Sequence, residues 1–342
     1  MPTAKKCGTI FKTKQKELKA LIKRILCGAL AALFVILSFS SCAQSEKVVM
    51  TVSGAQISQG FFAYYFDKAV ASPLEYGLST DAGAQDFADK AVALCTRYVA
   101  SNTMFSEYGL SLTNAQKLEI TEKVNNYWVR YANHYEKIGV TRDVLNKVFT
   151  AEAYEDSIFT FLFDFGRDDT EAEEQIKDYF AQNYVVFKTV SSYFTATDAS
   201  GSEIKMTQAQ KDELVKKFKG YASAASSEEA FITALQADGL TLSSTVLLKK
   251  GQSGYPQGFF EKVIEQDADT AQVISFEDYV FAVWKYDSAS RENEYESCRT
   301  QCLKDMYRDA SEKAFAYEET GYKVETDEGA VSYFKSRISD FG

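Results

Sequence analysis

Apolar side chains recur at helical spacing over about a hundred residues, and this pattern restricts the fold more than any other feature. One apolar stripe runs through residues 85–108, and the stretches 114–139 and 141–165 repeat it. Side chains three or four positions apart share one face of a helix. Residues 59–71 add a helix rich in aromatic rings. We therefore predict an all-helical module over residues 59–165.

The pattern changes to alternating strands and helices from residue 184 onward. Residues 184–195 (YVVFKTVSSYFT) and 279–286 (YVFAVWKY) are β-branched and aromatic, which is typical of strands. We expect a compact α+β domain with the order strand, helix, helix, strand, helix, strand. These elements are predicted at residues 184–195, 207–221, 227–238, 240–248, 259–266 and 279–286.

Residues 292–320 predict one long helix that carries too many apolar residues for solvent on all sides. Its apolar stripe must therefore pack on earlier structure, and the helices of residues 59–165 are the simplest partner. On this interpretation the α+β domain is an insertion, and the fold class is multidomain α+β. The predicted segments are 1–41 (signal), 42–170 (helical domain), 171–288 (inserted domain) and 289–342 (C-terminal helix on the helical domain).

An uncharged apolar run at residues 25–39 follows eight lysine and arginine residues and a single acid, Glu17. This arrangement is typical of a secretory signal. The run is shorter than the roughly 20 residues that a spanning helix needs. The run ends in Phe39-Ser-Ser-Cys42, which resembles a bacterial lipobox except that Phe39 replaces the usual aliphatic residue. We expect lipidation at Cys42 and anchoring to a membrane. Ordinary signal cleavage and a retained single-span anchor remain alternatives.

The net charge argues against nucleic acid as a partner. The whole chain carries a formal charge of −10, and removal of residues 1–41 would take away eight basic residues and one acidic residue, leaving −17. Proteins that hold phosphate polymers do so mainly through clustered lysine and arginine, and no basic stripe remains after cleavage.

Cysteine and histidine usage predicts neither a metal site nor a cofactor. Beyond Cys42 the chain has Cys95, Cys298 and Cys302, and its only histidine is His134. Cys298 and Cys302 lie one helical turn apart, which is poor geometry for a disulfide. A bridge from Cys95 to one of them remains open, although buried free thiols are expected. His134 has no nearby nucleophile in the pattern and is expected to be structural or at the surface.

Five strings of residues, in this order along the chain, resemble the PrsA and SurA family of extracytoplasmic folding factors. Family members carry parvulin-type peptidyl-prolyl isomerase domains. Residues 47–66 (KVVMTVSGAQISQGFFAYYF) resemble the opening strand, turn and helix of the family. The other strings are EYGLSLTNAQKLEI at 107–120, YEKIGVTRDVLNKVF at 135–149, YFAQNYVVFKTVSSYFTATDASG at 179–201 and GYPQGFFEKVIEQDADTAQVISFEDYVFAVWKYD at 254–287.

The resemblance implies a helical chaperone module with an inserted parvulin-like domain, and one departure bears on catalysis. Parvulins place a histidine on the first strand and usually another on the last. The corresponding residues here, 188–193 and 280–282, contain none. We therefore expect weak or absent isomerase activity and assign no catalytic residue. An active isomerase with a rearranged pocket is the first alternative, and a lipid-anchored solute-binding protein is the second.

The predicted function is a lipid-anchored chaperone, a holdase or foldase on the extracytoplasmic face of the cell membrane. Its expected partners are unfolded or nascent exported proteins. Aromatic residues bind apolar segments without demanding a particular sequence, and two aromatic groups in the helical module could line such a surface. Packing in the core is the alternative. The candidate client-binding residues are Phe61, Phe62, Tyr65, Trp128, Tyr131 and Tyr135.

Overall fold

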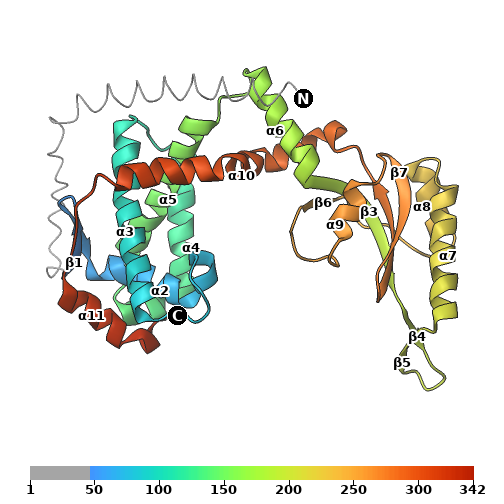
Figure 1. The fold of residues 1–342 in the computed structure, drawn as a ribbon, viewed down its shortest axis with the longest axis horizontal. Coiled ribbons are helices and arrows are strands. Elements are labelled where there is room, and N and C mark those ends of the chain that lie inside the picture. Colours follow the sequence, from blue (N-terminus) through green and yellow to red (C-terminus); the bar gives the residue numbers. More distant parts are fainter. Residues whose placement is uncertain (1–46) are drawn as a thin grey trace. The chain divides into compact units, whose positions relative to one another are not determined.

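The computed structural model describes residues 47–342, which form two compact units (Figure 1). The helical unit comprises residues 47–161 and 311–342, and the sheet unit comprises residues 162–310. The predicted signal segment and the predicted lipidation site Cys42 lie outside the described residues. None of the described helices is both long enough and apolar enough to span a bilayer.

A three-stranded antiparallel sheet brings the two ends of the helical unit together. β1 (Val48–Val52) and β2 (Ala55–Ser58) form a hairpin across Ser53 and Gly54, whose φ angles are 48° and 89°. Positive φ is costly for most residues and easy for glycine. β9 (Val324–Thr326) pairs with the other side of β1, in the order β2-β1-β9. The C-terminal segment therefore returns to the N-terminal strand.

Five helices surround an aromatic core in the helical unit. Thr113 and Gln116 form a capping box at the start of α4, as the sequence predicts. In the core, the rings of Phe62, Phe66 and Phe334 lie 4.9 to 6.3 Å apart. The helices are α2 (Gln59–Ala71), α3 (Ala84–Glu107), α4 (Asn114–Ile138), α5 (Arg142–Phe163, whose last two residues belong to the sheet unit) and α11 (Glu328–Ser336), with short 3₁₀ turns at Pro73–Tyr76 and Ile338–Asp340.

A four-stranded antiparallel sheet in the order β6-β3-β8-β7 organises the sheet unit. The long strand β3 (Tyr184–Tyr193) pairs with β6 (Val246–Lys249) on one side and with β8 (Tyr279–Lys285) on the other. β7 (Thr270–Ser275) pairs only with β8, so it forms one edge of the sheet.

Helices cover both faces of this sheet (Figure 1): α7 (Gln208–Ala224) and α8 (Glu228–Gln236) lie on one face, and α9 (Phe259–Ile264) lies on the other. Trp284 of β8 faces α8, where its ring lies 6.1 Å from Phe231. Because successive strand residues face opposite sides, the neighbours of Trp284 face α9. The remaining elements are α6 (Thr170–Asn183), the hairpin of β4 (Thr195–Thr197) and β5 (Glu203–Lys205), and a 3₁₀ turn at Ser288–Ser290.

α10 (Glu292–Glu319) contributes residues to both units. Residues up to Ala310 belong to the sheet unit, and the rest belong to the helical unit. In the sheet unit, Arg299 is only 6% exposed and its guanidinium is bound by the carboxylates of Asp164 and Glu173. The sequence predicted instead that the whole C-terminal segment, residues 289–342, packs on the helical domain.

The three cysteines among the described residues are free and buried, as expected. Cys95 lies in the core of the helical unit, where burial raises the pKa of its thiol. The Sγ atoms of Cys298 and Cys302 lie 3.9 Å apart in the sheet unit. The bridge to Cys95 that the sequence left open is not formed in the described part of the chain. The predicted α+β class is confirmed.

Candidate functional site

Three of the six predicted client-binding residues are buried in the core of the helical unit. Phe61, Phe62 and Tyr135 are 4%, 0% and 1% exposed. The ring of Phe61 lies 4.3 Å from that of Tyr98, and the ring of Phe62 lies 4.9 Å from that of Phe334. These three side chains cannot reach a client while the core is folded. Their expected place on a binding surface is therefore corrected to a structural role.

The other three residues, Tyr65, Trp128 and Tyr131, retain some exposure but are not brought together. Tyr65 and Trp128 are half-buried, and Tyr131 is 40% exposed. The guanidinium of Arg142 lies 5.4 Å from the ring of Trp128. In the described part of the chain, no ring contact joins any two of these three residues. These three residues therefore stay candidates for client binding, without direct contact between their rings.

The ammonium group of Lys68 lies among four tyrosine rings of the helical unit. Its Nζ atom is 5.5, 6.0, 5.9 and 5.8 Å from the ring centroids of Tyr64, Tyr127, Tyr131 and Tyr135. A cation at such distances is attracted by the electron-rich ring faces. The exposed Tyr131 thus belongs to a cluster that already holds a cation from the same chain.

His134 has a structural partner. Its Nε2 atom lies 2.7 Å from Oδ1 of Asp67, a carboxylate that is 3% exposed. The backbone N–H of Gly342 donates to the same oxygen at 3.1 Å. Asp67 of α2 therefore binds both His134 of α4 and the amide of Gly342, and these contacts hold α2 against the two neighbouring segments.

An aromatic surface lies on the sheet unit over β3 and β8, on the face that carries α9. Tyr193 is 60% exposed and lies directly opposite Tyr279, with ring centroids 4.7 Å apart. Tyr255, Phe276 and Tyr279 are half-buried. The neighbouring Tyr193 phenol raises the pKa of Tyr279 above its ordinary value. We call Tyr193, Tyr255, Phe276 and Tyr279 the aromatic surface.

Buried phenylalanines support the aromatic surface from beneath. Phe259 of α9 and Phe281 of β8 are 1% and 6% exposed, and their rings meet at 5.0 Å. Tyr255 stacks on Phe259 at 4.4 Å, and Phe276 meets Phe281 edge-on at 6.0 Å. Core packing therefore fixes the rings of the surface before any ligand arrives, which lowers the entropic cost of binding.

The polar side chains beside the aromatic surface offer hydroxyl groups and no imidazole. Thr189 Oγ1 donates to the carbonyl oxygen of Ala282 at 3.1 Å, and the Thr189 amide donates to Ser243 Oγ at 3.1 Å. Ser191 lies two residues further along β3 and is exposed. The only histidine of the chain, His134, belongs to the helical unit. No proton donor or acceptor that titrates near neutral pH lies on β3 or β8 at this surface.

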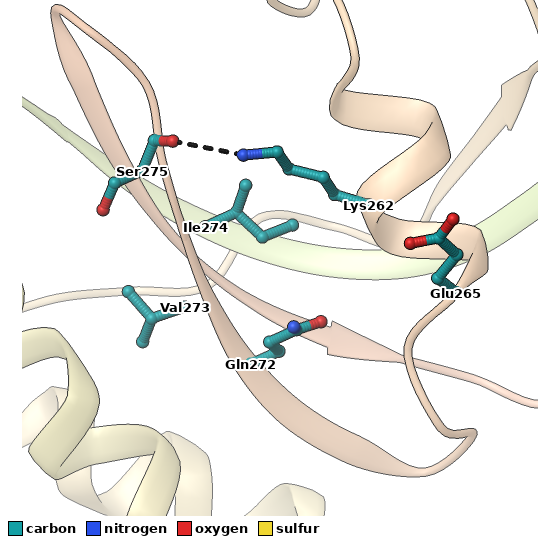
Figure 2. A pocket seen from close by; sticks show the side chains of 6 residues that line it. All are labelled: Lys262, Glu265, Gln272, Val273, Ile274 and Ser275. Atoms are coloured by element: carbon teal, nitrogen blue, oxygen red, sulfur yellow. Dashed lines mark hydrogen bonds between the residues drawn. The ribbon is translucent and has the colours of Figure 1, made fainter.

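Two open depressions lie elsewhere on the sheet unit. One, of about 330 Å³, lies between α9 and β7, and Lys262 reaches across it to donate to the Ser275 carbonyl oxygen at 3.5 Å (Figure 2). The other, of about 380 Å³, lies beside the ion pair of Lys249 and Asp305, whose Nζ and Oδ2 atoms are 2.5 Å apart. Among residues 47–342, no three His, Cys, Asp or Glu side chains are grouped to hold a metal ion.

Aromatic rings and hydroxyl groups are thus the main chemical groups at the aromatic surface. No protein-family model matches the chain, and no curated protein matches it. The solved structures that are similar to it include two foldases. Foldase protein PrsA from Streptococcus pneumoniae str. Canada MDR_19A is 12% identical with a TM-score of 0.36, over 84% of this chain and 98% of that chain. Foldase protein PrsA from Lactococcus lactis is 11% identical with a TM-score of 0.36, over 86% and 100%. Both are foldase structures of the PrsA type, which is the family that the five strings of residues resemble.

The sequence did not indicate the aromatic surface because its four rings are spread over residues 193–279, whereas the rings near residue 61 are adjacent in the chain. Tyr279 and Phe281 alternate along their strand with Val280 and Ala282. That period-two pattern places two aromatic rings on one face of the sheet. This alternation, taken together with Tyr255 and the helix predicted at residues 259–266, is the signal that could have indicated the surface.

Proposed function

We propose that this chain is a folding factor that binds unfolded exported polypeptides at the aromatic surface, without isomerase catalysis. The observation that carries the proposal is the pair of the exposed Tyr193 and the half-buried Tyr279, which lies on buried phenylalanine rings without a histidine nearby. Apolar and aromatic client segments would be shielded there from one another. Shielding of this kind prevents aggregation and needs no chemical step.

The physical basis of the binding is contact with rings that are already fixed in place. An aromatic pair contributes about 0.5–1.5 kcal/mol beyond the area that it buries. A surface of four rings therefore supports weak binding that releases a client readily. Tyr65, Trp128 and Tyr131 would add separate weak contacts on the helical unit. Several weak contacts on one flexible client raise the overall affinity by avidity.

The proposed lack of isomerase activity is supported by the absence of histidine from β3 and β8. Rotation about a peptide bond has a barrier of about 18–20 kcal/mol. Catalysis requires polar groups that stabilise the twisted bond more than the planar one. In the sheet unit, the hydroxyl of Thr189 already donates to the carbonyl oxygen of Ala282, and neither β3 nor β8 carries a histidine. The surface would therefore bind proline-containing segments without accelerating their isomerisation.

Attachment to a membrane is part of the proposal and rests on the sequence before residue 47. A lipid on Cys42 would place the folded units outside the cell, beside the site where exported chains emerge. A single acyl chain gives only marginal binding, whereas two or more anchor stably. Metabolic labelling with a radioactive fatty acid tests this step. A Cys42→Ala variant should lose the label and leave the membrane fraction.

The experiment that tests the function is suppression of aggregation by the mature chain, residues 43–342. Light scattering of several unrelated unfolded proteins should fall as the chain approaches a stoichiometric ratio. A protease-coupled assay with a proline peptide should give the uncatalysed rate in the same preparation. No suppression for any client would contradict the chaperone proposal. A rate above the uncatalysed control would instead identify an active isomerase.

A further inference from the structure

The edge strand β7 leaves half of its main-chain groups without a strand partner. In an antiparallel pair, residues alternate between those that bond to the neighbouring strand and those whose groups point away from it. The N–H of Phe276 donates to the carbonyl oxygen of Tyr279 at 2.8 Å, which fixes this alternation. Ile274 therefore faces β8, and the N–H and C=O groups of Ala271 and Val273 point outward.

These outward groups have no protein partner. Within residues 47–342, no hydrogen bond engages the main chain of Ala271 or Val273 on that side. The next outward carbonyl, that of Ser275, accepts only the long 3.5 Å contact from Lys262 (Figure 2). Ala271 and Val273 are half-buried, Ser275 is exposed, and an open depression lies beside the strand. The edge is therefore open to another backbone.

Protection against strand pairing is weak along this edge. Proteins commonly blunt exposed edges with proline, charged residues or bulges. The six residues of β7 (TAQVIS) include none of these, and their register with β8 is unbroken. In Figure 2, Lys262 reaches from α9 to the end of the strand, where its Nζ atom contacts the Ser275 carbonyl oxygen and lies 4.8 Å from the centroid of the Phe276 ring.

We infer that β7 binds an extended segment of an unfolded polypeptide, which joins the sheet as an additional strand. The outward N–H and C=O groups repeat every second residue, and another extended backbone can form hydrogen bonds with them whatever its side chains are. Lys262 and Glu265 line the adjacent depression and offer a donor and an acceptor to side chains of either charge. Phe276 directly follows β7, so the same segment would continue onto the aromatic surface.

This inference rests on the proposed function, because the bound segment belongs to a client. It adds a mode of recognition that depends on the backbone. The aromatic surface selects apolar side chains, whereas the edge accepts any residue that extends, apart from proline, which lacks the N–H. Clients without aromatic-rich segments would then still be held.

Hydrogen exchange of the mature chain with reduced, carboxymethylated lactalbumin as the unfolded probe tests the inference. When free probe is about ten times its Kd, the amides of Ala271 and Val273 should exchange about tenfold more slowly. The amide of Ile274, already bonded to β8, should change much less. Unchanged exchange at Ala271 and Val273 while the probe is bound would overturn the inference. In that case, aggregation suppression would still stand and the proposed function would survive.

Two variants and a matched control separate the backbone from the side chains. Val273→Pro removes an outward N–H without removing a bond to β8 and should raise the Kd of the probe about fivefold. Val273→Lys places a charge on the edge with the backbone intact and should also raise it. Gln236→Ala alters an exposed glutamine of α8 that does not line the depression, and it should leave the Kd unchanged. Equal Kd values for all three variants would overturn the inference.

A second copy of this chain is the competing occupant of the edge. If it paired there, the amides of Ala271 and Val273 would be protected without probe, and protection would grow with protein concentration. Light scattering would then report a dimer that Val273→Lys abolishes. That outcome would overturn the assignment to a client segment, whereas a monomer with unprotected amides supports it.

Discussion

Tyr193 and Tyr279 lie directly opposite each other on β3 and β8, with their rings 4.7 Å apart at an interplanar angle of 47°. Tyr193 is 60% exposed, whereas the phenylalanines beneath the pair are buried. The pair is thus held by a rigid strand ladder and still faces solvent. Tyrosine in such a position provides a large contact area and loses little side-chain entropy on binding.

Removal of this pair should leave the fold intact. The double variant Tyr193→Ala, Tyr279→Ala should melt cooperatively, with a Tm within about 5 °C of the wild type, because little of the core is lost. Phe259→Ala is the matched contrast, since that ring is 1% exposed and its loss should cost about 3–5 kcal/mol. Thermal melts followed by circular dichroism compare the two. A double variant as unstable as Phe259→Ala would show that the pair is structural.

Gly60 should be irreplaceable, because α2 approaches another backbone at this point. A Cβ atom at Gly60 would lie 2.4 Å from the carbonyl oxygen of Gly139, and a main-chain atom cannot move aside cheaply. Gly60→Ala should therefore lower the free energy of unfolding by several times the usual effect of a surface change. Gly220, within α7, has nothing within 4 Å of the same position.

Gly220→Ala is therefore the control, and it should stabilise the protein by roughly 0.5–1 kcal/mol through helix propensity. Urea unfolding of the two variants beside the wild type measures both effects. Changes of the same sign would contradict the close approach of α2 to Gly139.

The network around Arg299 should govern acid stability of the sheet unit. Hydrogen bonds from Arg299 hold the pKa of Asp164 below its ordinary value. Burial acts to raise the pKa of Glu173, but hydrogen bonds from Arg299 and Tyr295 outweigh it, so the pKa is lowered. A carboxyl whose pKa is lower in the folded state stabilises the fold above its unfolded pKa. That contribution is lost as the pH falls through the folded pKa, which here lies below the ordinary range near 4.

Arg299→Met should therefore cost about 3 kcal/mol at pH 7, because it leaves two carboxylates without their partner. It should also flatten the loss of stability between pH 5 and 3, since the pKa values of both acids would rise. Lys205→Met is the control, because the Lys205 and Asp278 side chains are 80% and 56% exposed and their ion pair contributes little. Chemical unfolding at a series of pH values measures the slopes. An unchanged slope in Arg299→Met would contradict this account.

Lys68 should stabilise the helical unit through its charge. Four tyrosine rings lie within 6.0 Å of its Nζ atom. Lys68→Met keeps a long apolar side chain and removes the cation, and should cost about 1–2 kcal/mol. Lys68→Arg keeps a cation and should recover most of that loss. Urea unfolding distinguishes them, and equal stabilities of the Met and Arg variants would show that the charge has no role.

The helices were predictable because their signals are local. The stripe over residues 85–108 and the capping box at Thr113 each lie within one stretch of sequence, and both appear in the structure. β7 was not predicted because its sequence has only three apolar residues, which are broken by Gln272 and flanked by Thr270 and Ser275. A strand of this kind is stabilised mainly by pairing with its neighbour, here β8. The strand expected at 240–248 is confined to β6, where pairing with β3 begins only at Val246.

The candidate site was less predictable than the fold. Aromatic density around Phe61 and Phe62 does not reveal which helix face is covered, and these rings lie in the core. The pairing of Tyr193 with Tyr279 depends on the register of β3 against β8, which joins residues far apart in the chain. Register follows from the packing of a whole sheet, so a single strand sequence does not specify it.

The central claim is that the aromatic surface on the sheet unit contacts unfolded clients. Aggregation suppression should be compared for the wild type, the double variant Tyr193→Ala, Tyr279→Ala, and Tyr317→Ala, which removes a ring that is 66% exposed on the helical unit. The account predicts that the double variant needs several times more protein for half-suppression, whereas Tyr317→Ala matches the wild type. A folded double variant that suppresses aggregation as well as the wild type would contradict it.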